Sequence, residues 1–208
     1  NKDRAQQKFL SEELCKSELE ELKKISKRLS CSGAGARLPL IDFAAPALKQ
    51  LSHKQKSKFV DTVFGVVKSD GYIEHFEWVF VAVLRRHLSG HKKHKHSGLL
   101  GEFPQSVSVV LGALAYCGAE NEKVASESFD KSAKSFGFTN LSMPKFAACT
   151  VGSVESELQK LNNLKFTEKE KFLNACLVCV THDNQVTTDE GETIRAIGDL
   201  LDCPIPMY

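Results

Sequence analysis

The sequence lacks several features that would assign it to a large class of proteins. It has no signal peptide and no apolar run near the about 20 residues that a membrane-spanning helix needs. Its 28 Lys and Arg almost balance its 26 Asp and Glu, so the concentrated basic face of a nucleic-acid-binding domain is not expected. No segment alternates apolar and polar residues for long enough to demand a β-strand. We therefore expect a soluble all-α domain that does not bind nucleic acid and, because it starts at Asn1 without Met, a fragment of a longer chain.

Motifs of catalysis are also missing. A zinc metallopeptidase of the His-Glu-x-x-His class needs two imidazoles that hold zinc and a carboxylate that activates a water molecule. The sequence has no His-Glu dipeptide, and residues 74–77 read Glu-His-Phe-Glu, which is the wrong order. No nucleophile elbow or glycine-rich phosphate loop is present either. We expect no enzyme activity from this chain.

Cysteine usage indicates a reducing compartment. The seven cysteines are odd in number, and most occupy apolar positions of helical patterns, where a free thiol behaves as a small hydrophobic group. Cys176 and Cys179 have the spacing of a metal-binding pair, but they lie in an apolar run without a second Cys or His pair. We expect both to be buried structural thiols.

Apolar residues at three- to five-residue steps predict a succession of amphipathic helices. In the first half they are expected over residues 3–29, from a cap at Asp42 through Pro46 to Gln50, from Ser52 to a turn at Asp70, and from about Glu74 onward. In the second half one helix is expected to begin at Pro104, and another to run through Val124 to a stop at Gly137. A further helix is expected from Ser142 to Leu161, with a possible interruption at Gly152, and the last two are expected to begin at Thr167 and Thr187. Capping boxes are predicted at Ser52 with Gln55, Thr167 with Glu170, and Thr187 with Glu190. The helix after Ser52 is expected to bury Phe59, Val60, Val63, Val66 and Val67.

The chain repeats one helix-turn-helix unit at a fixed offset of 113 positions (172 − 59), which pairs Phe59 with Phe172. The same offset pairs Asp70 with Asp183. It also pairs Leu51 with Leu164, Lys58 with Lys171, Ile73 with Val186, Glu77 with Glu190, Leu84 with Ile197 and Leu88 with Leu201. Gly71 and Asn184 share the turn position, and these residue types tolerate a left-handed backbone best. The sequence therefore predicts a helical bundle with two related units.

Two resemblances follow from these residues. The string Asp70-Gly71-x-Ile73-x-x-x-Glu77 between two helices resembles the signature of TerB-like helical domains, with a looser second copy from Asp183 to Glu190. The Arg-Leu-Pro-Leu string from Arg37 and the Leu-Asp-Cys-Pro string to Pro204 resemble the C-terminal cytosolic region of bacterial HtpX-like integral-membrane zinc metallopeptidases.

This second resemblance implies that the chain is a non-catalytic accessory or regulatory domain on the cytoplasmic side of a bacterial inner membrane. It would pack on the parent peptidase domain, or recruit partners or substrates. Zinc would belong to the parent peptidase domain, and no cofactor is expected in this fragment. The TerB resemblance implies the alternative of a divalent-metal-binding or stress-sensing domain.

The two acidic turns are the candidate metal sites, because carboxylates are hard oxygen ligands for divalent cations. The candidate ligands are Asp70, Glu74, Glu77, Asp183, Asp189 and Glu190. The preferred interpretation is structural: each Asp closes one helix, and each Glu satisfies free N–H groups in the first turn of the next.

A His/Lys-rich segment at residues 91–103 is expected to be a solvated loop between two lobes. Its Lys92, Lys93 and Lys95 could contact an anionic membrane surface. The expected organisation is an N-terminal helix and connector (1–50), a first TerB-like unit (51–90), the loop (91–103), linking helices (104–160) and a second TerB-like unit (161–208).

Overall fold

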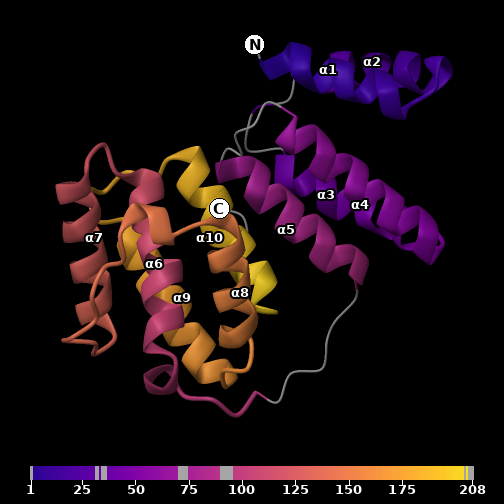
Figure 1. Cartoon of the computed structure of the whole chain (residues 1–208). Coiled ribbons are helices and arrows are strands. Elements are labelled where there is room, and N and C mark those ends of the chain that lie inside the picture. The colour runs from indigo at the N-terminus through magenta and orange to yellow at the C-terminus, as the bar shows by residue number, and fades with distance from the viewer. Residues whose placement is uncertain are drawn as a thin grey trace. The chain divides into compact units, whose positions relative to one another are not determined.

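The structure is a computed structural model that describes residues 2–30, 33, 37–69, 75–89, 96–203 and 205. In this part of the chain the regular elements are helices, and the β-structure is limited to one isolated bridge between Gly98 and Leu164 (Figure 1). The prediction of an all-α fold is therefore confirmed. The chain divides into two compact units, Asn1–Gly90 and His91–Tyr208, and each is described by itself.

The described residues of the first unit form five helices. In chain order they are α1 (Lys2–Glu13), α2 (Lys16–Leu29), α3 (Arg37–Lys49), α4 (His53–Lys68) and α5 (His75–Ser89). Helix α5 packs against α3 and α4, and α1 packs against α4. Most of the buried apolar surface comes from α5, whose residues Val79 and 81–84 are at most 4% exposed. Helix α5 is therefore the core element of this unit.

Two predictions for the first unit are wrong. The single helix expected over residues 3–29 is broken at Leu14 and Cys15, where Cys15 becomes an N-cap residue and its N–H donates to Glu18 at 2.8 Å. Asp42 does not cap a helix, because α3 already begins at Arg37 and Asp42 lies inside it. Its carboxylate instead faces His87 of α5, with 3.3 Å between Oδ1 and Nε2.

Helix α4 begins as predicted but buries less than predicted. Ser52 and Gln55 form the expected capping box, in which the Gln55 amide oxygen accepts from the Ser52 N–H at 2.9 Å. Of the five apolar residues expected inside, only Val67 is buried, and Phe59 is 36% exposed. Contact with α1 is close at Gly65, where an added Cβ would lie 2.1 Å from the Phe9 ring. Because Gly65 has no side chain, the Phe9 ring can lie directly against α4 at this position.

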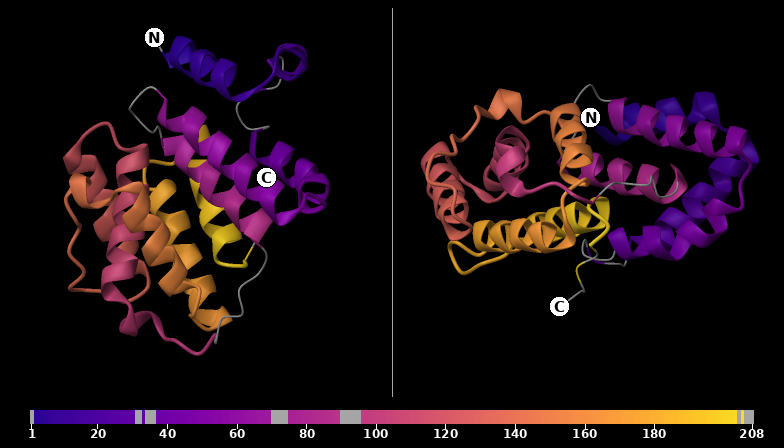
Figure 2. Two further views of the ribbon diagram at one scale, coloured as in Figure 1. Left: turned by 45° about the vertical axis from the view of Figure 1, so that its right-hand side comes forward. Right: turned by 90° about the horizontal axis from the view of Figure 1, so that it is seen from below.

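The second unit surrounds α6. Its elements are η2 (Leu100–Glu102), α6 (Pro104–Gly118), α7 (Glu122–Ser135), η3 (Phe146–Ala148), α8 (Val151–Leu161), α9 (Phe166–Val180) and α10 (Thr188–Leu200). Helix α6 packs against α7, α8, α9 and α10, and its residues 106–112 are all buried (Figure 2). Small and hydroxyl side chains let the neighbours approach: Ser106 donates to Glu157 at 2.6 Å, and the Pro144 ring lies against Gly112.

Helix boundaries in the second unit follow the local signals, with two exceptions. Pro104 begins α6, and Gly137, with a φ of +94°, follows the end of α7 as predicted. The predicted capping box of Thr167 with Glu170 is wrong, because α9 already starts at Phe166 with Lys165 as its N-cap. The stretch from Ser142 does not become one helix, since η3 precedes α8 and Thr150 caps α8 just before Gly152.

The 113-residue offset recurs in the starts of two helices. Helices α4 and α9 begin at His53 and Phe166, after N-cap residues Ser52 and Lys165. Environments differ, however, since Phe172 is fully buried where its counterpart Phe59 is partly exposed. Asn184 has the expected left-handed backbone, with a φ of +63°, whereas Gly71 lies outside the described residues. Duplication of the whole unit therefore stays a prediction.

Candidate ligand groove

A groove in the first unit is built on one face of α4. The capping box at Ser52 fixes where this helix begins, and therefore which side chains share a face. His53, Lys56, Ser57, Val60 and Asp61 follow one another at helical spacing along the groove. This face carries polar groups at both of its ends and an aliphatic residue between them.

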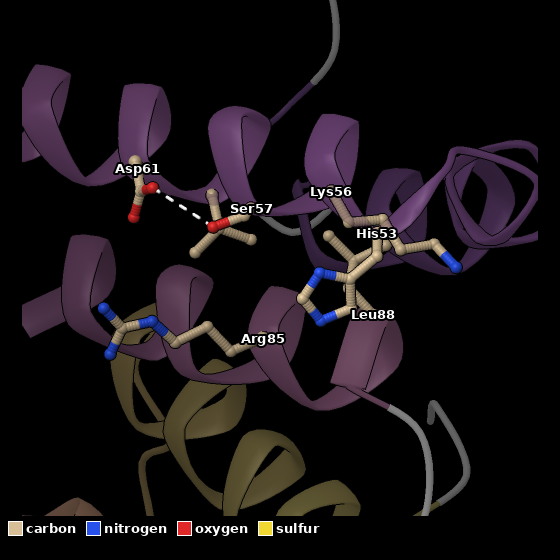
Figure 3. A pocket seen from close by; sticks show the side chains of 7 residues that line it. His53, Lys56, Ser57, Asp61, Arg85 and Leu88 are labelled. Atoms are coloured by element: carbon tan, nitrogen blue, oxygen red, sulfur yellow. Dashed lines mark hydrogen bonds between the residues drawn. The ribbon is translucent and has the colours of Figure 1, made fainter.

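The second wall of the groove comes from α5. Arg85 and Leu88, one helical turn apart, complete a pocket of about 490 Å³ (Figure 3). In the close view the Arg85 guanidinium extends toward the Asp61 end, whereas Lys56 lies at the other end beside His53 and Leu88. A volume of this size is typical of sites for small ligands or for a few residues of a peptide.

Cations dominate the lining of the groove. Lys56 and Arg85 are the basic residues of the lining beside His53, and Asp61 is the one acid among the lining residues. The Arg85 guanidinium lies over the Phe64 ring, 4.8 Å from its centroid, which restrains the direction of its side chain. The groove is therefore suited to a negatively charged ligand.

The groove also contains a serine, a histidine and an aspartate, but their arrangement does not support hydrolysis. Ser57 Oγ donates to Asp61 Oδ2 at 3.3 Å, so its proton is directed to the carboxylate rather than to His53. In a serine hydrolase the imidazole takes the hydroxyl proton and the carboxylate orients the imidazole. This geometry favours binding over nucleophilic catalysis.

The predicted acidic turn of the second unit is engaged in local hydrogen bonds. Glu190 is buried and closes the predicted capping box, accepting from the Thr187 N–H and hydroxyl at 2.8 Å each. Asp183 is exposed and accepts from the N–H of Gln185 at 2.9 Å, and Asp189 is exposed in the first turn of α10. The structural role expected for Glu190 is confirmed.

In the first acidic turn, Asp70 and Glu74 lie outside the described residues. Glu77 is half-buried in the first turn of α5 and accepts a hydrogen bond from the side chain of Gln6 on α1, at 3.4 Å. Within the residues that the structure describes, no three His, Cys, Asp or Glu side chains converge as a metal site would require. Lys92, Lys93 and Lys95, the candidate membrane contacts, also lie outside the described residues.

The cysteine pair in α9 is buried as predicted. Burial raises the pKa of the Cys176 thiol well above its ordinary value and that of Cys179 to about 11, and the Ser128 hydroxyl lies 3.0 Å from the Cys179 sulfur. Burial also raises the pKa of Cys117 to about 11. At neutral pH these thiols are protonated, and a thiol is a far weaker nucleophile and metal ligand than a thiolate.

Sequence reasoning missed a buried lysine in the second unit. Lys169 is 0% exposed, and its Nζ donates to Asn162 Oδ1 at 2.5 Å and to the Leu201 carbonyl at 2.8 Å. Asn162 in turn donates to the Leu200 carbonyl at 3.0 Å. These bonds tie α9 and the end of α8 to the C-terminal end of α10, where carbonyl groups lack helical partners.

The groove residues Lys56 and Arg85 were missed as well. The repeat gave a signal for Lys56, because Lys56 and Lys169 are also separated by 113 positions and both units have lysine there. Arg85 gives no such signal, since its counterpart is Gly198.

Comparison of this chain with protein-family models, with curated proteins and with solved structures finds no match. No helix in the described ranges is both long and apolar enough to cross a membrane.

Proposed function

We propose that this chain is a non-catalytic interaction module, and that it binds a negatively charged partner segment in the groove between α4 and α5. The observation that carries the proposal is the 490 Å³ pocket that combines Lys56 and Arg85 with the aliphatic side chains of Val60 and Leu88. Cations beside apolar surface provide both steering and desolvated contact for a protein partner.

The cellular context that we propose is a membrane-bound zinc metallopeptidase of the HtpX-like kind. It is supported by the resemblance of the strings that begin at Arg37 and end at Pro204. In that context the module would pack on the peptidase domain or bring partners or substrates to it. Zinc would be held by residues of the peptidase domain, outside this chain.

A direct test compares the natural protein with a form that lacks residues 1–208 and with a form that carries Lys56→Glu and Arg85→Glu. We expect both changes to alter proteolysis of substrates or the set of co-purified partners, while zinc content stays the same. A form with Lys54→Glu and Lys58→Glu, two exposed positions of the same helix outside the groove lining, is the matched control. Unchanged proteolysis, localisation and partners on deletion would refute the proposal.

The proposed parent can be tested separately by reading the gene upstream of Asn1. Hydrophobic spans and a His-Glu-x-x-His motif encoded there would support it. An upstream sequence without that motif would remove the peptidase context and leave the groove to be explained in another protein.

A further inference from the structure

The groove between α4 and α5 has a counterpart between α9 and α10. Helices α4 and α9 start 113 positions apart, and the predicted repeat extends this offset to α5 and α10, so residues that line the groove have partners at known positions. The pairs are Lys56 and Lys169, Ser57 and Glu170, Val60 and Leu173, Arg85 and Gly198, and Leu88 and Leu201.

In the second unit this place is filled by the chain itself. After α10 the backbone folds back, with the Cys203 N–H donating to the Gly198 carbonyl at 2.8 Å. A Cβ added at Gly198 would lie 2.8 Å from the Cys203 carbonyl oxygen and 2.9 Å from Ile205 Cγ1. Cys203 and Ile205 thus lie directly on the face of α10 at Gly198, the position that corresponds to Arg85.

A hydrogen bond joins the chain just before Cys203 to α9. Burial raises the pKa of Cys203, and the charges of Lys169 and Glu170 also act on it, in opposite directions. Lys169 at the same time donates to the Leu201 carbonyl. The backbone of Cys203 and the aliphatic side chain of Ile205 therefore lie at the place that corresponds to the groove.

The sequence of the first unit is not suited to filling its groove in this way. Arg85 stands where Gly198 allows close approach, and Lys92 stands at the offset position of Ile205. The groove of the first unit is lined by Lys56 and Arg85. These cations favour an occupant that brings negative charge.

We infer that the α4/α5 groove binds an extended acidic peptide segment, in which carboxylates flank one aliphatic residue. This inference rests on the proposed interaction function and names its ligand. The aliphatic side chain packs on Val60 and Leu88, as Ile205 packs against α10 in the second unit. One carboxylate pairs with Lys56 and the other with Arg85, which lie toward opposite ends of the groove in Figure 3.

The two cations have different tasks in this complex. The planar guanidinium of Arg85 can hold a carboxylate through two parallel hydrogen bonds, and Phe64 restrains it in advance. Lys56 supplies a point charge on a flexible stem, which tolerates variation in the second acid. Asp61 repels acids beyond the Arg85 end and so limits the length of the bound segment.

The test is a titration of the isotope-labelled 208-residue chain with a blocked peptide of sequence Gly-Glu-Ile-Glu-Gly, followed by nuclear magnetic resonance. We expect saturable shifts of the backbone amides of Lys56, Ser57, Val60 and Arg85. The peptide with Gln in place of both Glu residues should bind at least about tenfold more weakly, because charge-assisted hydrogen bonds are about twice as strong as neutral ones.

Variants locate the site. Lys56→Gln and Arg85→Gln should each weaken peptide binding about tenfold, whereas Lys54→Gln, which removes the same charge from an exposed position of α4, should change it less than about twofold. Circular dichroism of each variant verifies that it folds. The inference is overturned by shifts confined to other elements, by equal loss in Lys54→Gln, by equal binding of the Gln peptide, or by a single-stranded oligonucleotide that occupies the groove more tightly than the peptide.

The outcome is separable from that of the proposed function. If the peptide binds in the groove but deletion of the region leaves the natural protein unaffected, the ligand class holds and the cellular role is wrong. If deletion alters proteolysis or partners but no acidic peptide binds in the groove, the role holds and this ligand is wrong.

Discussion

Replacing the buried Lys169 tests how the second unit is held together. Lys169→Met keeps most of the side-chain volume but removes the donor to Asn162 Oδ1 and to the Leu201 carbonyl, both in residues that are at most 3% exposed. A buried acceptor left without a donor costs about 1–3 kcal/mol, so two cost about 2–6 kcal/mol. The variant also avoids the cost of burying a charged ammonium group, which offsets part of the lost stability. We therefore expect the free energy of unfolding to fall by about 2–4 kcal/mol.

The matched control is Lys56→Met, which changes the same residue type at the offset position. Lys56 is half-exposed in an open groove, so its replacement should alter stability by less than about 0.5 kcal/mol. Urea unfolding followed by far-ultraviolet circular dichroism reports on both units. Fluorescence of Trp78, the single tryptophan, follows α5 of the first unit.

A change of less than about 0.5 kcal/mol in Lys169→Met, or an equal loss in Lys56→Met, would refute this account of Lys169. A loss accompanied by faster hydrogen exchange at the last turn of α10 would support it, because that turn supplies the carbonyl groups that the Lys169 and Asn162 side chains satisfy.

Three further predictions concern packing, thiol reactivity and metal binding. Gly198→Ala should cost about 1–3 kcal/mol and speed hydrogen exchange at Cys203, since the new methyl group meets backbone 2.8 Å away. At pH 8 a thiol reagent should modify the exposed Cys15 before Cys179, because a pKa of about 11 leaves Cys179 with about 0.1% thiolate. Calorimetric titration with calcium, magnesium or zinc should show no stoichiometric micromolar binding, because the Glu190 carboxylate already closes a capping box.

Each of these has a result that would contradict it. Gly152→Ala, at a position with open space around it, should be neutral or stabilising by up to about 1 kcal/mol, and a loss there equal to that of Gly198→Ala would remove the packing explanation. Folding raises the pKa of Cys179 from 9.0 to about 11, so its contribution to stability is complete below about pH 9 and is lost as pH rises through 11. Stability that rises over that range, or saturable metal binding abolished by Asp183→Asn, would oppose the account.

Local sequence signals predicted the correct structure where hydrogen bonds within four residues determine it. Two helix starts are of this kind, at the capping boxes of Ser52 and Thr187. The turn with left-handed backbone at Asn184 is another example. The box expected at Thr167 failed because the N-cap of helix α9 is Lys165, two residues earlier. Glu168 lies in the first turn and accepts from the distant N–H of Leu100 at 3.1 Å. A partner 68 residues away cannot be read from a local pattern.

The burial of individual side chains and the formation of the groove depend on which helices pack together. The periodicity of apolar residues within one helix does not determine that packing. Phe59 and Phe172 lie at equivalent positions of similar helical patterns, yet only Phe172 is surrounded by neighbouring helices. A lysine in a helix is expected at the surface, whereas Lys169 is buried because carbonyl groups at the end of α10 accept from it. The groove follows from the approach of α5 to α4, which no segment of the sequence specifies alone.

Photocrosslinking from the groove tests the central claim most directly. A photoreactive phenylalanine analogue is placed at Ser57 in the natural protein, in cells, and at the exposed Lys54 as a control, and the crosslinked peptides are sequenced by mass spectrometry. The account predicts crosslinks from position 57, and not from 54, to segments in which Asp or Glu flanks an aliphatic residue. Crosslinks that are the same from both positions, or that carry no acidic segment, would contradict it.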